Sequence, residues 1–99
     1  MRHAFEISKL AELDLESIWL YTMQNWSLTQ ADKYYNMIIS EIYSICDNPE
    51  IGKAIEELKK EHRVQKIESH LIIYKIKKDK IWIDRILHKR MDIESRLIE

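Results

Sequence analysis

A histidine and three cationic side chains gather in one short segment near the end of the chain. Residues 85–92 read Arg-Ile-Leu-His-Lys-Arg-Met-Asp, so His88 lies between Arg85 and the pair Lys89 and Arg90. An imidazole can donate or accept a proton near neutral pH, and a guanidinium binds phosphate oxygens in a fixed, forked geometry. The segment could therefore transfer protons on a phosphate ester or bind an acidic target.

Each of these residues also has a purely structural interpretation. A histidine at a strand end, such as His88, is more often hydrogen-bonded there than it is an acid–base group. Arg63, a further candidate cation, could pair with Asp84 or Asp92 across a sheet. His70 is expected to open a strand and to orient a loop. The sequence leaves the functional role of Arg63 open against the structural one.

A metal site and a cofactor are not predicted. The single cysteine, Cys46, excludes an intrachain disulfide and falls in an apolar helical pattern, where it is expected to be a small buried hydrophobe. The histidines show no zinc-ligand spacing. The tryptophans are far apart and are expected to anchor the core or a strand edge rather than to form a base-stacking platform. These residues are His3, His62, His70 and His88, and Trp19, Trp26 and Trp82.

Composition indicates one soluble domain spanning residues 1–99. The chain has 45% hydrophobic and 33% charged residues, and it lacks an apolar run of the roughly 20 residues that a membrane span needs. A cytoplasmic location is expected, since no signal peptide is recognised. The net charge of −1 hides an asymmetry: residues 1–58 carry 4 Lys/Arg and 10 Asp/Glu (net −6), and residues 59–90 carry 11 and 4 (net +7). The basic part could attract an acidic protein or nucleic acid, or it could be a set of solvated strand edges.

Hydrophobic periodicity predicts a helical hairpin after a short first strand at residues 3–8. Ser8 is the expected N-cap of a helix running to about Trp26, and Ser27 begins a capping box for a helix running to about Asp47. Gly52 is expected to supply a positive φ in the turn that follows. The predicted core positions are Ala11, Leu15, Ile18, Trp19, Thr22 and Trp26 on the first helix, and Leu28, Ala31, Tyr35, Ile38, Ile42 and Ile45 on the second.

The second half predicts three strands, at residues 62–67, 70–77 and 80–88. In the last strand Ile81, Ile83 and Leu87 form one alternating set, which Arg85 interrupts. Residues 91–98 could add one or two helical turns. The predicted order is β-α-α-β-β-β, an α+β fold in which a helical hairpin packs on a mostly antiparallel sheet.

Leucines on the outer side of the first helix are candidates for a partner contact. Leu13 and Leu20 are seven residues apart and lie opposite the predicted core side, with Met23 beside them. A pair of leucines at helical spacing on a charged face favours a partner groove over chance exposure.

A series of short motifs along nearly the whole chain carries a family resemblance. They are Ser8, Ala11, Asp14-Leu15, Ile18-Trp19, Tyr21-Thr22, Trp26-Ser27, Gln30-Ala31, Tyr34-Tyr35, Asn48-Pro49, Gly52, Arg63, His70, Ile72-Ile73-Tyr74, Ile86-Leu87-His88, Arg90 and Asp92. In this order the chain resembles the ParE branch of the RelE/ParE toxin superfamily. One departure is that Glu61 and His62 stand where the family often has a glycine.

The resemblance implies a toxin of a type II toxin–antitoxin system, of the kind linked to plasmid stabilisation. It implies a small DNA-binding antitoxin as partner, expected at Leu13, Leu20 and Met23. It also implies DNA gyrase as the poisoned target, so nucleic acid would be met only through gyrase or the antitoxin, and the protein would not be an enzyme. The target-binding candidates are Arg63, Arg85, His88, Lys89 and Arg90.

The alternative is a RelE-type ribonuclease that cuts messenger RNA on the ribosome. RelE-type relatives use Arg and Lys together with a His, Glu or Tyr, and often a tyrosine near the C-terminus. The catalytic candidates would then be Arg63, Arg85, His88 and Arg90. Since no tyrosine follows Tyr74, the set is incomplete and the gyrase interpretation is preferred.

Overall fold

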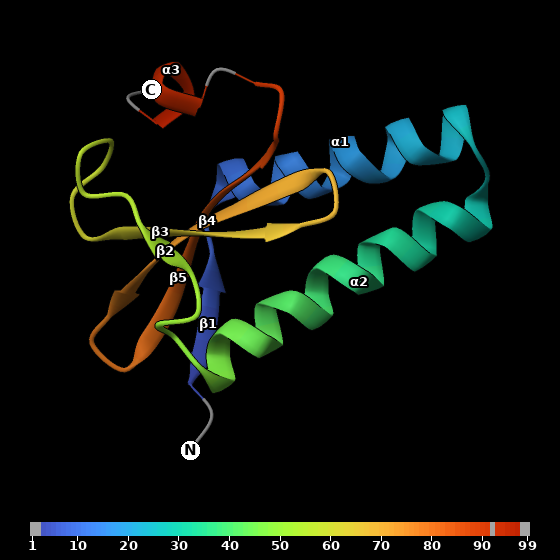
Figure 1. The fold of residues 1–99 in the computed structure, drawn as a ribbon. Helices are drawn as coiled ribbons and strands as arrows, with labels where there is room; N and C mark the ends of the chain where they lie inside the picture. Colours follow the sequence, from blue (N-terminus) through green and yellow to red (C-terminus); the bar gives the residue numbers. More distant parts are fainter. Residues whose placement is uncertain (1–2, 92, 98–99) are drawn as a thin grey trace.

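Two helices pack against one face of a five-stranded sheet in the computed structural model, which describes residues 3–91 and 93–97 (Figure 1). The strand order is β1-β5-β4-β3-β2, with β1 parallel to β5 and every other neighbouring pair antiparallel. The predicted α+β order is confirmed, α3 lies within the residues expected to form helical turns, and β2 is an addition. The elements are β1 (Ala4–Ile7), α1 (Lys9–Asn25), α2 (Leu28–Asp47), β2 (Lys53–Ala54), β3 (His62–Ile67), β4 (His70–Lys77), β5 (Lys80–His88) and α3 (Ile93–Leu97).

Serine caps begin both long helices, as predicted. The Ser8 hydroxyl accepts from Ala11 N at 3.0 Å and donates to the Asp84 carbonyl at 2.6 Å, so the cap also ties α1 to β5. The Ser27 hydroxyl accepts from Gln30 N at 3.0 Å. Each cap satisfies a backbone donor that has no partner within the helix. Within the described residues, no helix has the length and apolar content to cross a membrane.

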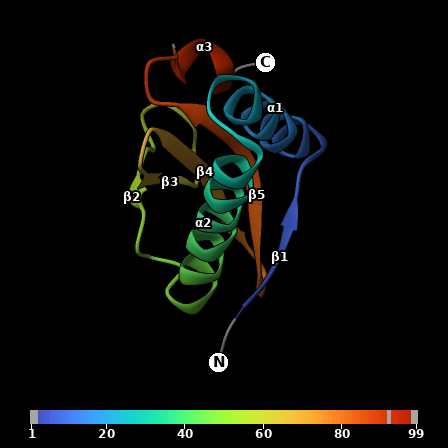
Figure 2. The same cartoon turned by 90° about the vertical axis from the view of Figure 1, so that its right-hand side faces the viewer.

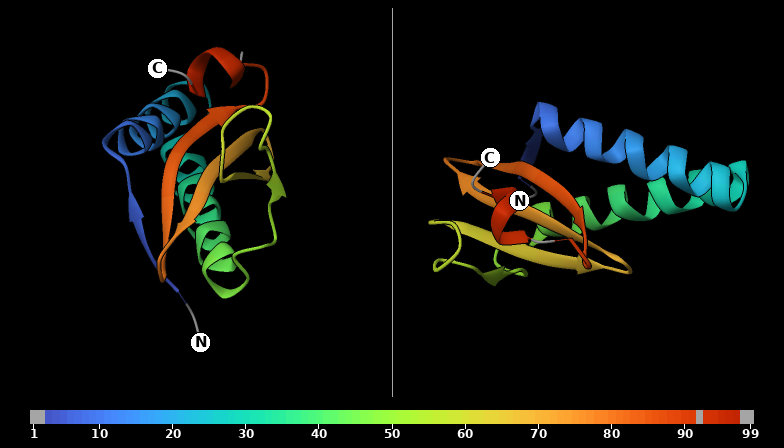
Figure 3. Two further views of the ribbon diagram at one scale, coloured as in Figure 1. Left: turned by 90° about the vertical axis from the view of Figure 1, so that its left-hand side faces the viewer. Right: turned by 90° about the horizontal axis from the view of Figure 1, so that it is seen from above.

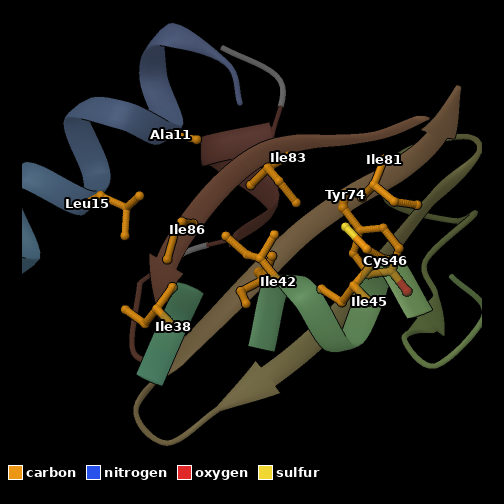
Figure 4. Close-up of a cluster of buried hydrophobic side chains, with 11 residues drawn as sticks. Ala11, Leu15, Ile38, Ile42, Ile45, Cys46, Tyr74, Ile81, Ile83 and Ile86 are labelled. Carbon is orange, nitrogen blue, oxygen red and sulfur yellow. The ribbon is translucent and has the colours of Figure 1, made fainter. Parts of the chain in front are cut away.

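The main core lies between the helical hairpin and the sheet, and a smaller core lies on the opposite face. Figure 4 shows the side chains of the main core pointing into the space between α1, α2 and the strands. Ile55, Ile73, Leu87 and Leu97 form the second core, so the β2–β3 connection and α3 cover part of the other face. The main core comprises Ala11 and Leu15 of α1, Ile38, Ile42, Ile45 and Cys46 of α2, and Ile72, Tyr74, Ile81, Ile83 and Ile86 of the sheet.

The loop end of the hairpin projects beyond the sheet, as Figures 1 and 3 show, and Figure 2 shows both helices on the same face. The buried residues of α1 are Ala11 and Leu15, both in its first half. Three predicted core positions are therefore wrong: Trp26 is 76% exposed, Leu28 58% and Tyr35 39%. The apolar periodicity of the helices continues past the point where the sheet ends, so it leaves apolar surface uncovered there.

A β-bulge in β5 changes the face on which its side chains lie. Ile73 pairs with Arg85 but Tyr74 pairs with Ile83, so the extra residue on β5 is Asp84. Ile83 and Ile86 consequently share the main core, while Leu87 belongs to the second core. The predicted set of Ile81, Ile83 and Leu87 on one face is wrong, because the bulge inverts the alternation after Asp84.

Gly52 is required for close packing and not for a positive φ, which no described glycine has. A Cβ on Gly52 would lie 2.6 Å from the Tyr74 hydroxyl and 2.9 Å from the Val64 carbonyl oxygen. The buried Tyr74 hydroxyl accepts from Gly52 N at 2.9 Å and donates to the Pro49 carbonyl at 2.7 Å, which fastens the turn after α2. The prediction that Gly52 supplies a positive φ is therefore wrong, because the position needs glycine for its lack of a side chain.

Positive φ values occur instead at three residues with side chains. Glu61 (66°), Glu68 (52°) and Lys78 (57°) lie in the connections before β3, β4 and β5. Non-glycine residues pay a steric cost in this conformation. Glu61 is one of the two residues that stand where the resembling family often has a glycine, and its positive φ is a conformation that glycine adopts without steric cost. Lys78 defines the tight turn between β4 and β5 that lacks a glycine.

We predict that Gly52→Ala lowers the free energy of unfolding by about 2 kcal/mol, because the added methyl must displace the Tyr74 ring or the β3 backbone. Urea denaturation followed by circular dichroism measures the change. A Gly52→Ala protein that unfolds at the wild-type urea concentration would contradict the packing role.

Glu61→Gly removes the steric cost of a side chain at positive φ, so it should leave the free energy of unfolding unchanged or raise it by up to about 1 kcal/mol. The same denaturation experiment measures this change.

Candidate functional site

The start of β4 and the end of β5 bring two histidines together beside the helical hairpin. His70 and His88 lie directly opposite each other in the sheet register, with ring centroids 5.2 Å apart and ring planes at 86°. Counting back from the Lys77–Lys80 pair without a bulge would place Leu87 opposite His70. The bulge at Asp84 therefore creates this histidine pair.

A tyrosine from α2 completes the cluster. The Tyr34 hydroxyl lies 2.7 Å from His70 Nδ1, and it accepts a weaker hydrogen bond from Ser69 N at 3.3 Å. Tyrosine is protonated at neutral pH at its ordinary pKa, and burial raises the pKa of Tyr34 further. From the sequence, Tyr34 was identified only as part of the motif Tyr34-Tyr35 and not as a site residue, because its partner lies 36 residues further along the chain.

His70 is neutral at physiological pH. The pKa of His70 is about 4, because burial lowers it most and the nearby His88 adds to this effect, while the Asp14 carboxylate opposes both. A neutral His70 can accept the Tyr34 hydroxyl proton at Nδ1 and carry its own proton on Nε2. His88 Nδ1 accepts from Arg90 N at 3.1 Å, so a neutral His88 also carries its proton on Nε2.

These three side chains form the polar floor of a groove of about 830 Å³ between the hairpin and this end of the sheet. Its aromatic walls come from the overhanging part of the hairpin, where Tyr21 is 65% exposed and Trp26 is 76% exposed. The described residues that line the groove include no lysine or arginine. They are Ser17, Ile18, Tyr21, Thr22, Trp26, Gln30, Tyr34, Ser69, His70, His88 and Met91.

Arg85 and Arg63, both target-binding candidates, make structural contacts outside the groove. The Asp14 carboxylate accepts from Arg85 Nε at 2.9 Å and Arg85 Nη2 at 3.0 Å, and it also accepts from Ile86 N at 2.9 Å. Arg63 donates to the Gly52 carbonyl at 2.6 Å, next to the Tyr74 clamp. Arg85 thereby joins α1 to β5, and Arg63 joins β3 to the turn after α2.

Asp84, one of the two partners considered for Arg63, pairs with other residues. Asp84 pairs with Lys59 Nζ at 2.7 Å and has His62 Nε2 at 3.4 Å. Asp92, the other partner considered for Arg63, lies outside the described residues. Lys89 and Arg90 are exposed at the end of β5, so of the candidate cations they are the ones presented to solvent beside His88.

The leucines proposed for an antitoxin contact are exposed on α1, as predicted. Leu13 is 47% exposed and Leu20 is 40% exposed, and Met23 is partly buried. None of the three lines the groove. They mark a second apolar surface on the same hairpin.

In the part of the chain that the structure describes, no three His, Cys, Asp or Glu side chains are grouped to hold a metal ion.

We predict that His70 makes stability fall on acidification. Its pKa is about 4 in the folded protein, against about 6.5 for an unfolded chain, so the unfolded state binds more protons between these values. The free energy of unfolding should therefore decrease as pH falls from about 6.5 toward 4, and His70→Gln should reduce this slope. Urea denaturation at a series of pH values measures it. An NMR titration in which His70 titrates near its unfolded value would contradict the prediction.

Comparisons with known proteins agree with one another. The sequence model of the family described as "ParE toxin of type II toxin-antitoxin system, parDE" matches residues 5–93. "Toxin ParE1" of Mycobacterium tuberculosis (strain ATCC 25618 / H37Rv) is 32% identical over 98 residues, which cover 98% of this chain and 100% of the relative. "Toxin ParE1" of Caulobacter vibrioides is 30% identical over 93 residues, which cover 94% and 96% respectively.

Solved structures show the same fold. The chromosomal ParDE toxin–antitoxin system of P. aeruginosa contains a chain with a TM-score of 0.77 and 17% identity, covering 88% of this chain and 96% of that one. The toxin–antitoxin complex RelBE2 of Mycobacterium tuberculosis contains one with a TM-score of 0.71 and 12% identity, covering 90% and 100%. Fold, family match and sequence identity lead to one conclusion: the chain belongs to the ParE toxin family of type II toxin–antitoxin systems.

Proposed function

We propose that this ParE-family toxin acts in the cytoplasm by poisoning DNA gyrase and blocking replication, and that a cognate antitoxin binding the helical hairpin neutralises it. The observation that carries the choice of target class is the placement of the cations. Arg63 and Arg85 are bound to the protein itself, and the groove beside His88 contains no lysine or arginine among its described lining residues. Cleavage of RNA needs cations at the developing phosphate charge, so this arrangement favours a binding poison over a nuclease.

The end of β5 is the proposed contact with the target. Lys89 and Arg90 are exposed there, in a turn after β5 that hydrogen bonds from Lys89 N to the Ser69 carbonyl and from Met91 N to the His88 carbonyl hold, both at 2.9 Å. Cations on a rigid element lose less conformational freedom on binding than lysines on a mobile loop. Gyrase engaged with DNA offers both acidic protein surface and phosphate groups, which suits such a cluster.

The RelE-type alternative has one specific observation in its favour. In the groove, Tyr34 is hydrogen-bonded to His70, and the His70 ring packs edge-on against His88, so groups that can transfer protons lie together. A ribonuclease would then use histidine for both acid and base, without a bound arginine. Ribosome-dependent cleavage of messages at codon positions, detected by primer extension, would establish this alternative in place of the gyrase proposal.

We predict that the purified toxin inhibits gyrase supercoiling and accumulates cleaved DNA, and that Arg90→Ala abolishes both effects while antitoxin binding persists. Arg90 is exposed, so the substitution should leave the fold intact. Lys33→Ala, which removes an exposed charge from α2, is the matched control and should retain potency. A folded Arg90→Ala protein with wild-type potency would refute the role of this strand end.

A further prediction concerns the antitoxin surface. Leu13→Glu combined with Leu20→Glu should weaken antitoxin binding by several kcal/mol if both leucines are central anchors of the contact, about 2 kcal/mol or more for each. Calorimetric titration measures the affinity. Leu58→Glu combined with Ile76→Glu is the matched control, since these residues are 38% and 40% exposed and lie outside α1. Equal losses in both double variants, or no loss in either, would place the antitoxin elsewhere.

A further inference from the structure

The sheet has an uncovered basic area on the face away from the helical hairpin. Tyr74, Ile81 and Ile83 face the hairpin in the main core, so the residues that alternate with them, including Lys75 and Trp82, face the opposite side. At the other end of that face, α3 and the second core cover the strands. Figures 1 and 3 show that the β4–β5 turn, which leads into the start of β5, lies far from α3.

Trp82 stands at the centre of this area with lysines around it. It pairs with Lys75 across the β4–β5 ladder and with Glu6 across the β1–β5 pair. Lys77 Nζ lies 5.9 Å from the centroid of the Trp82 ring, and Lys80 is the register partner of Lys77. Trp82 and Lys75 are partly buried, which limits their rotamers, whereas the lysines near the turn are exposed.

A hollow of about 340 Å³ lies beside the ring. Its described lining residues are Glu6, Lys77, Lys78, Asp79, Lys80, Ile81 and Trp82. The volume of the hollow is at the small end of known ligand sites. Because an aromatic ring and ammonium groups border it, the hollow suits a ligand with a flat aromatic group next to a negative charge. A nucleotide has both parts.

The local charge is positive in spite of two carboxylates. Lys75, Lys77, Lys78 and Lys80 stand against Glu6 and Asp79. Lys80 Nζ contacts Glu6 Oε1 at 2.7 Å, and this contact lowers the pKa of Glu6 and raises the pKa of Lys80, so both stay charged. Because both side chains of this pair are exposed to solvent, the ion pair is weak, and a phosphate can replace Glu6 as the partner of Lys80 with little loss of free energy.

We propose that this face binds single-stranded nucleic acid without sequence preference, with a base stacked on Trp82 and phosphates contacted by Lys75, Lys77 and Lys80. Aromatic stacking next to a basic track is the arrangement by which proteins bind single strands. An acidic protein could pair with the lysines, but its carboxylates would not require the aromatic ring of Trp82. The sequence alone did not favour stacking because the three tryptophans are far apart. In the structure the neighbours of Trp82 on this face include Lys75, its register partner, and Lys77. The binding is direct and independent of gyrase.

Anisotropy of a fluorescein-labelled oligothymidylate of about twelve nucleotides tests the proposal on the purified toxin. The expected dissociation constant is roughly 10⁻⁴ to 10⁻⁶ M at moderate salt, and log K should fall with log salt with a slope of about −2 for three phosphates. Lys75→Glu combined with Lys77→Glu should weaken binding by about tenfold or more. Lys9→Glu combined with Lys33→Glu changes the net charge equally but on the helices, and it should have a much smaller effect.

The ring is tested separately. Trp82→Leu should weaken binding by about tenfold, and Trp82→Phe should restore most of the affinity, since phenylalanine also stacks. Circular dichroism establishes that each variant is folded. The proposal is overturned if the oligonucleotide does not bind, or if both lysine double variants weaken it equally. It is also overturned if polyglutamate competes as well as unlabelled oligonucleotide while Trp82→Leu has no effect, since the face would then bind an acidic protein.

Discussion

The contact between Asp14 and β5 holds the parts of this molecule together. One carboxylate accepts two hydrogen bonds from the Arg85 guanidinium and a third from Ile86 N, immediately after the bulge. Both charged side chains are largely buried, at 11% and 15% exposure, so removing either partner would leave a charge in a poorly solvated place. The contact joins the first half of α1 to β5, which pairs with both β1 and β4, and the Ser8 hydroxyl adds a hydrogen bond to the Asp84 carbonyl.

The candidate site follows from that attachment. Because α1 is fixed to β5 through its first half, the loop end of the hairpin extends beyond the sheet (Figure 1), and the groove lies beneath it. The bulge beside Asp84 turns His88 toward the hairpin, where it meets His70 and, through His70, Tyr34. The same bulge places Leu87 on the opposite face, in the second core. One irregularity in one strand thus decides which residues after Asp84 lie on each face.

Much of the fold could be predicted from the sequence because local signals are strong and agree. Ser8 and Ser27 mark helix starts, and Asn48 with Pro49 marks an end, by hydrogen bonding and ring geometry that depend on near neighbours. The site was less accessible. Arg85, which breaks the alternation in β5, was the one local sign of the bulge. Nothing local connects Tyr34 to His70, or Gly52 to the Tyr74 ring, since these contacts depend on how the elements pack. The exposure of Trp26 was missed because hydrophobic periodicity indicates which face of a helix is apolar but not how far the sheet that covers this face extends.

A double-mutant cycle on Asp14 and Arg85 tests most directly whether their contact supports the fold around the site. The free energy of unfolding is measured by urea denaturation for the wild type, Asp14→Asn, Arg85→Met and the double variant. The account predicts that each single substitution costs about 3 kcal/mol and that the coupling energy is about 2 kcal/mol, since the second substitution removes a charge that the first left unpaired. Single losses that simply add, with a coupling energy below about 0.5 kcal/mol, would contradict it.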